Sequence, residues 1–159
     1  LDARFEDRYW PQGYAAPQII LQAGMAAGRT NRRLSMRNIS FALTTQQFLD
    51  GTKDVTRRMG WATLGPGQIL CAVKKGMGLR PGEKIERLGK IGIISVRREP
   101  LSAMLTDLDY GFFECIREGF PPPHPNSWPS VFAEFFCASH KGCTPDSIVT
   151  RIEFRKIGD

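Results

Sequence analysis

The residues best suited to chemistry in this 159-residue sequence lie together in one octapeptide, residues 51–58. Within it Lys53 supplies an ammonium group, Thr56 a hydroxyl, and Arg57 and Arg58 two guanidiniums. Side chains of these kinds bind phosphates and carboxylates through charge-assisted hydrogen bonds. The octapeptide is therefore a candidate site for an anionic ligand. The alternative is an ordinary solvated loop with no ligand.

Two short elements must position this octapeptide. Residues 44–50 predict a helix, with Thr44 at its N-cap and Gln47 three residues later completing a capping box. Gly51 provides the positive φ that helices commonly use where they end. From Val55 onward the pattern predicts a short strand. The cationic residues are thus expected at a corner between a helix and a strand.

The composition limits the class of protein. The 22 lysines and arginines outnumber the 16 acidic residues, so the net charge of +6 favours an anionic partner such as RNA or a nucleotide. An apolar share of 42% is enough for the core of one domain. The sequence has no run of about 18 apolar residues and no secretory signal pattern. We therefore expect a cytoplasmic protein without a membrane segment.

Four cysteines are best read as reduced thiols, because no secretory signal accompanies them. Cys71 lies in an apolar run and is expected in the core, and Cys115 lies in a helical region. Cys137, His140 and Cys143 are spaced closely enough to share a metal, but a structural zinc site needs four ligands. We predict no metal here, and only a helix end followed by a turn.

The first 35 residues differ from the rest of the chain. They mix prolines and glycines with a basic end, and no helical or strand period runs through them. We expect an extension outside the compact domain, with Met36 as the natural start of the folded unit. The predicted domains are thus residues 1–35 as a flexible extension and residues 36–159 as the folded domain.

Within the folded domain, strands and helices alternate in a mixed order. Alternating or apolar runs predict strands at residues 38–43, 69–73, 89–98 and 148–154, in addition to the one after Gly51. Helices are predicted within residues 101–118 and over residues 130–140, where Val131, Phe132, Phe135 and Phe136 form an apolar stripe expected in the core. Glycines in the strand at 89–98 indicate bends or bulges. This order predicts an α+β fold built on a small, partly closed barrel.

A second basic segment follows the strand at residues 69–73. Residues 74–84 form a glycine-rich loop that begins with Lys74 and Lys75. The loop lacks the Gly-Lys-Ser/Thr ending of a Walker motif, so it is expected to be either a solvated loop or a phosphate contact. The sequence predicts no cofactor.

The pattern Gly51-x-Lys53-x-x-x-x-Arg58 resembles the signature of ASCH domains, which belong to the PUA-like superfamily. The resemblance extends over residues 36–157, through Glu118-Gly119-Phe120, Trp128 and the closing strand at 150–154, and is strongest to ASCH proteins of bacteria and phages. It implies a barrel of five or six strands, flanked by helices, with an RNA-binding cleft between barrel and helices. The departures from the family are the N-terminal extension and a proline-rich insertion at residues 121–129.

The resemblance also implies two possible activities. One branch of the family hydrolyses N4-acetylcytidine with a lysine, a threonine and a glutamate, which would fall on Lys53, Thr56 and Glu118. Strand residues three apart point to opposite faces, so Lys53 must lie in the turn before the strand if it is to meet Thr56. Arg58 would then hold a phosphate or Glu118 itself. Another branch cleaves RNA, but His124 and His140 do not form an evident catalytic pair.

Binding without catalysis requires no residue with a shifted pKa, and we therefore rank it as the first prediction. Lys53, Arg57, Arg58, Lys74 and Lys75 would attract phosphates. Three aromatic residues could stack an unpaired base: Trp61, Tyr110 and Trp128. The predicted partner is therefore RNA or a modified nucleoside or nucleotide, with amide hydrolysis and RNA cleavage as the alternatives. The sequence predicts no oligomeric state.

Overall fold

The computed structural model describes residues 36–158, in which five strands form one sheet. The strands are β1 (Asn38–Ser40), β2 (Val55–Arg58), β3 (Ile69–Val73), β4 (Arg87–Pro100) and β5 (Ile148–Ile157), in the spatial order β1-β3-β4-β5-β2. Only β1 and β3 are parallel. Each strand lies where the sequence predicted one, but β1 ends at Ser40 and not at residue 43, and β4 and β5 are longer than expected. The predicted extension, residues 1–35, lies outside the described residues.

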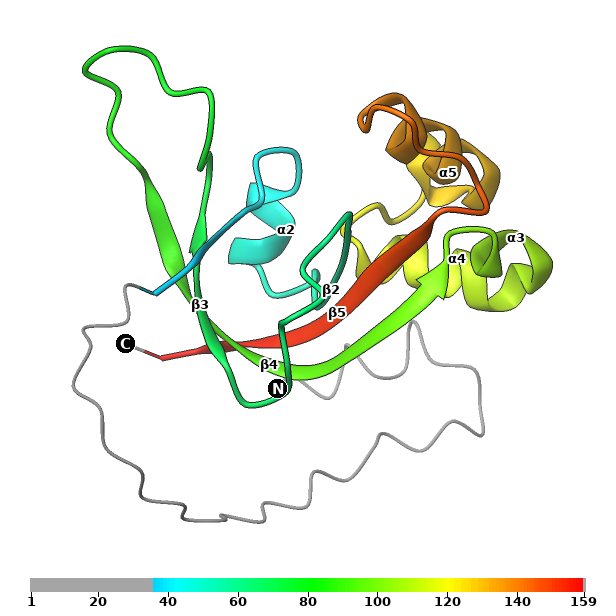
Figure 1. Ribbon diagram of the computed structural model, residues 1–159, viewed down its shortest axis with the longest axis horizontal. Coiled ribbons are helices and arrows are strands. Elements are labelled where there is room, and N and C mark those ends of the chain that lie inside the picture. Colours follow the sequence, from blue (N-terminus) through cyan, green and yellow to red (C-terminus); the bar gives the residue numbers. More distant parts are fainter. Residues whose placement is uncertain (1–35, 159) are drawn as a thin grey trace. The chain divides into compact units, whose positions relative to one another are not determined.

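The sheet is strongly curled, and its longest strands bend through irregular positions (Figure 1). The register between β4 and β5 shifts at Ile93, and that between β3 and β4 shifts at Ala72, opposite Gly89 with its φ of 144°. Such bulges bend a strand and increase its twist. Arg58 at the end of β2 donates a hydrogen bond to the Ser40 carbonyl at the end of β1, so the two edge strands are joined. The α+β fold on a small, partly closed barrel is confirmed.

Within residues 36–158, four α-helices and one 3-10 helix accompany the sheet. They are α2 (Thr45–Leu49), α3 (Ala103–Thr106), α4 (Leu108–Arg117), the 3-10 helix η1 (Pro125–Ser127) and α5 (Pro129–Ala138). The helix α2 lies beside the curled sheet, whereas α3, α4 and α5 gather at one end of the long strands (Figure 1). No helix among the described residues is long and apolar enough to span a membrane.

The start of α2 differs from the prediction. Thr44 occupies the N-cap position, but its side chain makes no capping hydrogen bond, so the prediction of a capping box is wrong. Instead the hydroxyl of Thr45 donates to the carbonyl of Phe41 at 2.8 Å. The chain between β1 and α2 is thereby held as a tight turn.

Buried apolar side chains form two separate cores. The first lies inside the barrel and includes Phe41, whose ring stacks on those of Phe48 and Phe154. The second lies among the helices and includes Phe120 and Phe132 together with the following residues: Leu101, Met104, Cys115, Ala133, Phe136 and Val149. The predicted apolar stripe of α5 supplies part of this core, except that Val131 is exposed.

Candidate functional site

A cavity of about 230 Å³ lies between the two cores. Its walls come from the turn after β1, from the segment that includes β2, and from α5. The lining residues are Ser40, Phe41, Ala42, Leu43, Thr44, Lys53, Thr56, Arg57, Arg58, Glu118, Phe120, Phe132, Phe135, Phe136, Ser139 and His140. The three residues that the family resemblance marks for hydrolysis, Lys53, Thr56 and Glu118, are therefore brought to one cavity.

Lys53 lies in the turn between α2 and β2, which is the position that lets it share a cavity with Thr56. Its side chain is buried, so the reading of this lysine as a solvated residue is wrong. The ammonium donates to the carbonyl of Val55 at 2.9 Å, to the carbonyl of Glu118, and to Glu118 Oε2 at 3.2 Å. Burial lowers the pKa of Lys53, and the Glu118 carboxylate opposes that shift.

Glu118 reaches the cavity because α4 ends there. It is the C-cap residue of α4, and Gly119 follows with a φ of 96°. A Cβ atom on Gly119 would lie 3.1–3.2 Å from side-chain atoms of Thr44 and Gln47, so a glycine allows the end of α4 to approach the start of α2. The positive φ at Gly119 thus ends α4 at the cavity.

Arg57 holds the other side of the Glu118 carboxylate. Its side chain is fully buried, and its Nη1 donates to Glu118 Oε1 at 3.2 Å. Its Nη2 donates to Glu99 Oε1 at 2.8 Å, to Glu114 Oε2 at 2.7 Å and to the Tyr110 hydroxyl at 2.9 Å. Burial alone would lower the pKa of Arg57, but the surrounding carboxylates, Glu118 first, raise it above its ordinary value. This guanidinium therefore orients Glu118 and is already saturated with acceptors.

Behind Arg57, Glu114 on α4 is the centre of a buried ionic network. It accepts from Arg151 Nε at 2.6 Å and Arg151 Nη2 at 2.9 Å in addition to Arg57. Burial by itself would raise the pKa of Glu114, but Arg151 and Arg57 lower it to about 2. The network fixes β2, β5 and α4 to one another and so fixes the floor of the cavity.

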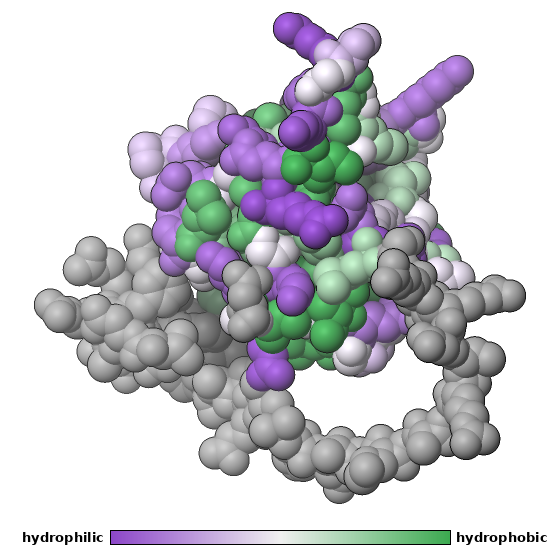
Figure 2. All heavy atoms as spheres, turned by 90° about the vertical axis from the view of Figure 1, so that its left-hand side faces the viewer, coloured by the Kyte–Doolittle hydropathy of each residue, from purple (hydrophilic) through white to green (hydrophobic). Residues whose placement is uncertain are grey.

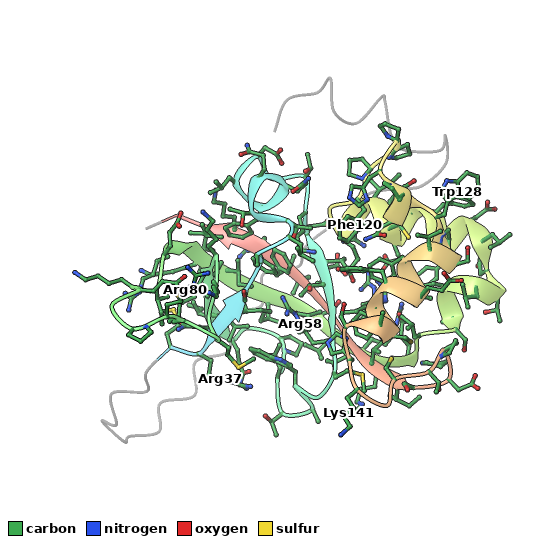
Figure 3. All side chains as sticks on the ribbon, turned by 90° about the horizontal axis from the view of Figure 1, so that it is seen from above. Arg37, Arg58, Arg80, Phe120, Trp128 and Lys141 are labelled. Atoms are coloured by element: carbon green, nitrogen blue, oxygen red, sulfur yellow. The ribbon has the colours of Figure 1, made fainter. Side chains whose placement is uncertain are left out.

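Arg58 and Thr56 have unused hydrogen-bonding capacity. Arg58 Nε is buried and has no hydrogen-bond partner, although the same guanidinium donates to the Ser40 carbonyl. Burial lowers the pKa of Arg58, which Glu118 partly offsets. The Thr56 side chain makes no hydrogen bond within residues 36–158. In Figure 3 Arg58 lies in the middle of the described residues, between the ribbons of β1 and β2.

The remaining predicted contact residues lie outside the cavity lining. Trp61 is half-buried against the barrel core with Arg37 stacked 4.2 Å from its ring centroid. Tyr110 bonds to the Arg57 network through its hydroxyl. Trp128 is 59% exposed and packs edge-on against Phe112, at the outer side of the helices in Figure 3. None of these three rings faces the cavity.

Lys74 and Lys75 lie on the loop between β3 and β4, also apart from the cavity lining. Lys74 pairs with Glu86 at 3.3 Å and Lys75 with Glu83 at 3.2 Å, both at the surface. Figure 2 shows hydrophilic side chains projecting at the top of the described residues, at the height where this loop stands in Figure 1. The charges of Lys74 and Lys75 are thus solvated and partly neutralised.

Sequence reasoning missed the aromatic walls of the cavity. Phe41, Phe120 and the three phenylalanines of α5 line it together with His140, whose ring stacks on Phe136 with a centroid distance of 4.3 Å. The periodic phenylalanines of α5 were the available signal, but they predict a core and not a ligand site. Cys137, His140 and Cys143 form no metal-binding cluster, since no such group occurs among the described residues.

Comparison with known proteins supports the fold. No protein-family model matches the sequence, and no curated protein matches it. The structure is similar to the ASCH domain of Lactobacillus crispatus, with a TM-score of 0.52 and 15% identity, over 77% of this chain and 79% of that chain. The described residues therefore have the fold of an ASCH domain, as the resemblance in the sequence predicted.

Two further solved structures match less closely. One is protein EF3133 of Enterococcus faecalis, with 15% identity, a TM-score of 0.49 and coverage of 79% of this chain and 82% of that chain. The other is a point mutant of ZmASCH from Zymomonas mobilis, with 13% identity, a TM-score of 0.45 and coverage of 76% of this chain and 68% of that chain. At these identities the likeness concerns the fold.

Proposed function

We propose that the chain binds an unpaired base, either in RNA or as a free nucleoside or nucleotide, in the cavity between the two cores. The observation that carries the proposal is the composition of the cavity, which combines Lys53, Arg58 and the Thr56 hydroxyl with a wall of phenylalanines. Aromatic walls stack the face of a base, while buried donors recognise its polar edge or a phosphate.

The unused hydrogen bonds supply the polar part of this recognition. Arg58 Nε is a buried donor without an acceptor, and the Thr56 hydroxyl is also without a partner in residues 36–158. Buried polar groups are normally hydrogen-bonded, and leaving one unpaired costs about 1–3 kcal/mol. Because Arg58 lines the cavity, a ligand that accepts a hydrogen bond from its guanidinium would gain a charge-assisted bond, worth about 1.5–3 kcal/mol.

The size of the cavity restricts the ligand. Pockets for drug-sized ligands usually span about 300–1,000 Å³, so a cavity of about 230 Å³ suits a single base or nucleoside. An RNA strand would therefore place one base inside and the rest of its backbone outside. Stacking of that base would contribute about 1–3 kcal/mol to the binding free energy.

The test measures binding of cytidine 5′-monophosphate and of a short unstructured RNA by titration calorimetry over a series of salt concentrations. We expect the affinity for RNA to fall with salt, and the affinity of Arg58→Gln to fall about 10-fold or more, because a charge-assisted hydrogen bond is worth about 1.5–3 kcal/mol. Arg155→Gln is the matched control, since Arg155 is exposed on β5 and changes the charge equally.

Thermal unfolding of each variant shows whether it has folded. Equal affinities of the folded Arg58→Gln and Arg155→Gln variants would contradict the proposal. It would also be contradicted if the wild type bound neither cytidine 5′-monophosphate nor the RNA. Arg58→Lys serves as a second variant that keeps the charge but loses the planar arrangement of donors.

Amide hydrolysis of an N4-acetylcytidine-like nucleoside is the second candidate. The observation that favours it is the convergence of Lys53, Thr56 and Glu118 on the cavity, with Lys53 Nζ 3.2 Å from Glu118 Oε2. A lowered lysine pKa is the change that a general base requires, and burial lowers the pKa of Lys53.

In this scheme the Thr56 oxygen attacks the acyl carbon and Lys53 accepts the hydroxyl proton. Glu118 relays that proton from Lys53 to the departing amine nitrogen as the C–N bond breaks, and water then hydrolyses the acyl-threonine ester, which releases the acid and restores the hydroxyl. We rank the scheme second because the Lys53 ammonium already donates three hydrogen bonds, none of them to Thr56. The lysine would have to lose a proton and turn before it could act as a base.

Incubation with N4-acetylcytidine tests this second candidate, with release of cytidine followed by chromatography. We expect turnover to be lost in Thr56→Val, which keeps the shape of the side chain but removes its hydroxyl. Turnover that survives in Thr56→Val would contradict the nucleophile role. The same incubation with RNA detects cleavage, which is the third activity that the family resemblance implies.

A further inference from the structure

Two thiols lie against each other at the edge of the helical core. Cys137 is in the last turn of α5 and Cys143 follows six residues later in the chain, and their Sγ atoms are 3.0 Å apart. Both cysteines are free and only partly buried, so a small oxidant can reach them. The other two cysteines, Cys71 and Cys115, are buried.

The segment between the two thiols is closed by backbone hydrogen bonds. The His140 amide donates to the Cys137 carbonyl at 3.2 Å, and the Cys143 amide donates to the His140 carbonyl at 3.1 Å. Gly142 has a φ of 74°, which allows the chain to turn back toward α5. The backbone thus already holds the two sulfur atoms together.

The same segment forms part of the cavity wall. Ser139 and His140 line the cavity, and the His140 ring is held by stacking on Phe136 and by a contact of 2.8 Å between Nδ1 and the Phe136 carbonyl. The two thiols therefore bracket residues that face the candidate ligand.

We propose that Cys137 and Cys143 are a reversible disulfide site, oxidised by small-molecule disulfides, and that the disulfide fixes the Ser139–His140 wall of the cavity. The sulfur atoms need to approach from 3.0 Å to about 2.05 Å, which requires little backbone displacement. The site assignment stands on the thiol geometry alone, whereas any consequence for a ligand rests on the proposed function.

The exchange with glutathione disulfide proceeds in two steps, in which glutathione disulfide is reduced and the two thiols are oxidised. The Cys143 thiolate attacks one glutathione sulfur, forming a mixed disulfide and releasing one glutathione thiolate. Cys137 then attacks the Cys143 sulfur, and the second glutathione leaves as a thiol. Because the two sulfur atoms are 3.0 Å apart, exchange of the roles of Cys137 and Cys143 gives the same products.

The test incubates the full chain with glutathione disulfide, alkylates the remaining thiols, and maps the peptides by mass spectrometry. We expect a peptide in which Cys137 is linked to Cys143, without retained glutathione, and its reversal by dithiothreitol. Cys71 and Cys115 serve as internal controls that stay unlinked. Free alkylated thiols at both positions, or glutathione retained on wild-type Cys143, would overturn the disulfide.

Two further measurements complete the test. In Cys137→Ser we expect glutathione to remain on Cys143, because the second thiol is missing, and rapid loss of glutathione from this variant would contradict the pairing.

Hydrogen exchange of the amides of residues 139–142 should slow several-fold on oxidation of the wild type. Unchanged exchange in a chain that carries the disulfide would refute the fixing of the cavity wall. Neither measurement requires a ligand, so their failure is distinct from failure of the proposed function.

Discussion

Replacing Glu114 by glutamine removes the carboxylate that two buried arginines share. Arg57 and Arg151 both donate to it at 2.6–2.9 Å, and its side chain is 2% exposed. The pKa of Glu114 falls from 4.5 to about 2 in the folded chain. At about 1.36 kcal/mol for each pKa unit, the charge of Glu114 contributes about 3 kcal/mol to the free energy of unfolding at pH 7. Breaking a buried ion pair costs a similar amount, about 3–5 kcal/mol.

The pH dependence follows from the direction of the shift. Because the folded pKa of Glu114 is depressed, its contribution is complete above pH 4.5 and is lost as the pH falls toward 2. Urea unfolding of wild type and Glu114→Gln should therefore differ by about 3 kcal/mol at pH 7 and by only about 1 kcal/mol at pH 3. Glu134→Gln is the matched control, since Glu134 is exposed on α5, and it should change the free energy by less than about 0.5 kcal/mol at both pH values.

Two results would refute this reasoning. A loss below about 1 kcal/mol at pH 7 would show that the buried network contributes far less than its geometry indicates. A difference between wild type and Glu114→Gln that stays constant from pH 7 to pH 3 would show that the loss comes from packing and not from the carboxylate charge.

Three further predictions concern other positions. Because burial lowers the pKa of Lys53 below 10.5, wild-type stability should rise with pH between that lowered pKa and 10.5, and Lys53→Met should lack this rise in urea unfolding. Gly111→Ala should cost more than about 2 kcal/mol, since its Cβ would lie 2.1 Å from the Met104 carbonyl oxygen, whereas Gly65→Ala, with open space around it, should cost under about 0.5 kcal/mol by the same assay. Trp128→Ala should leave the affinity for cytidine 5′-monophosphate unchanged in calorimetry, because the Trp128 ring lies outside the cavity lining; a large loss would place the ligand elsewhere.

Local sequence patterns predicted the elements around the site well. Gly51 ends α2 with a positive φ, β2 begins at Val55, and Pro129 opens α5, each at the position that its residue type indicated. These features depend on backbone preferences of neighbouring residues, which a sequence displays directly. Thr44 is the N-cap residue, as predicted, but its side chain makes no capping hydrogen bond, so only the capping box was wrong.

Contacts between distant parts of the chain could not be predicted in the same way. Glu99 lies 42 residues from Arg57 and Glu114 lies 57 residues from it, so the network depends on how β4 and α4 pack against β2. The place of single aromatic rings also depends on tertiary packing. Trp128 packs edge-on against Phe112 and lies outside the cavity lining, so its part in stacking a base stays a prediction. The phenylalanines that do face the cavity follow a periodicity that is equally typical of a helix packed into a core.

The place of the cavity between two separately packed cores has a mechanical consequence. The long β4–β5 pair carries the backbone from one core to the other: Ile93 and Phe154 belong to the barrel core, and Leu101 and Val149 to the helical one. A guest would touch both halves at once, so moving the halves apart would first require its departure. An occupied cavity would therefore raise the free energy of opening this junction, by about 2.7 kcal/mol when the ligand concentration is a hundred times Kd.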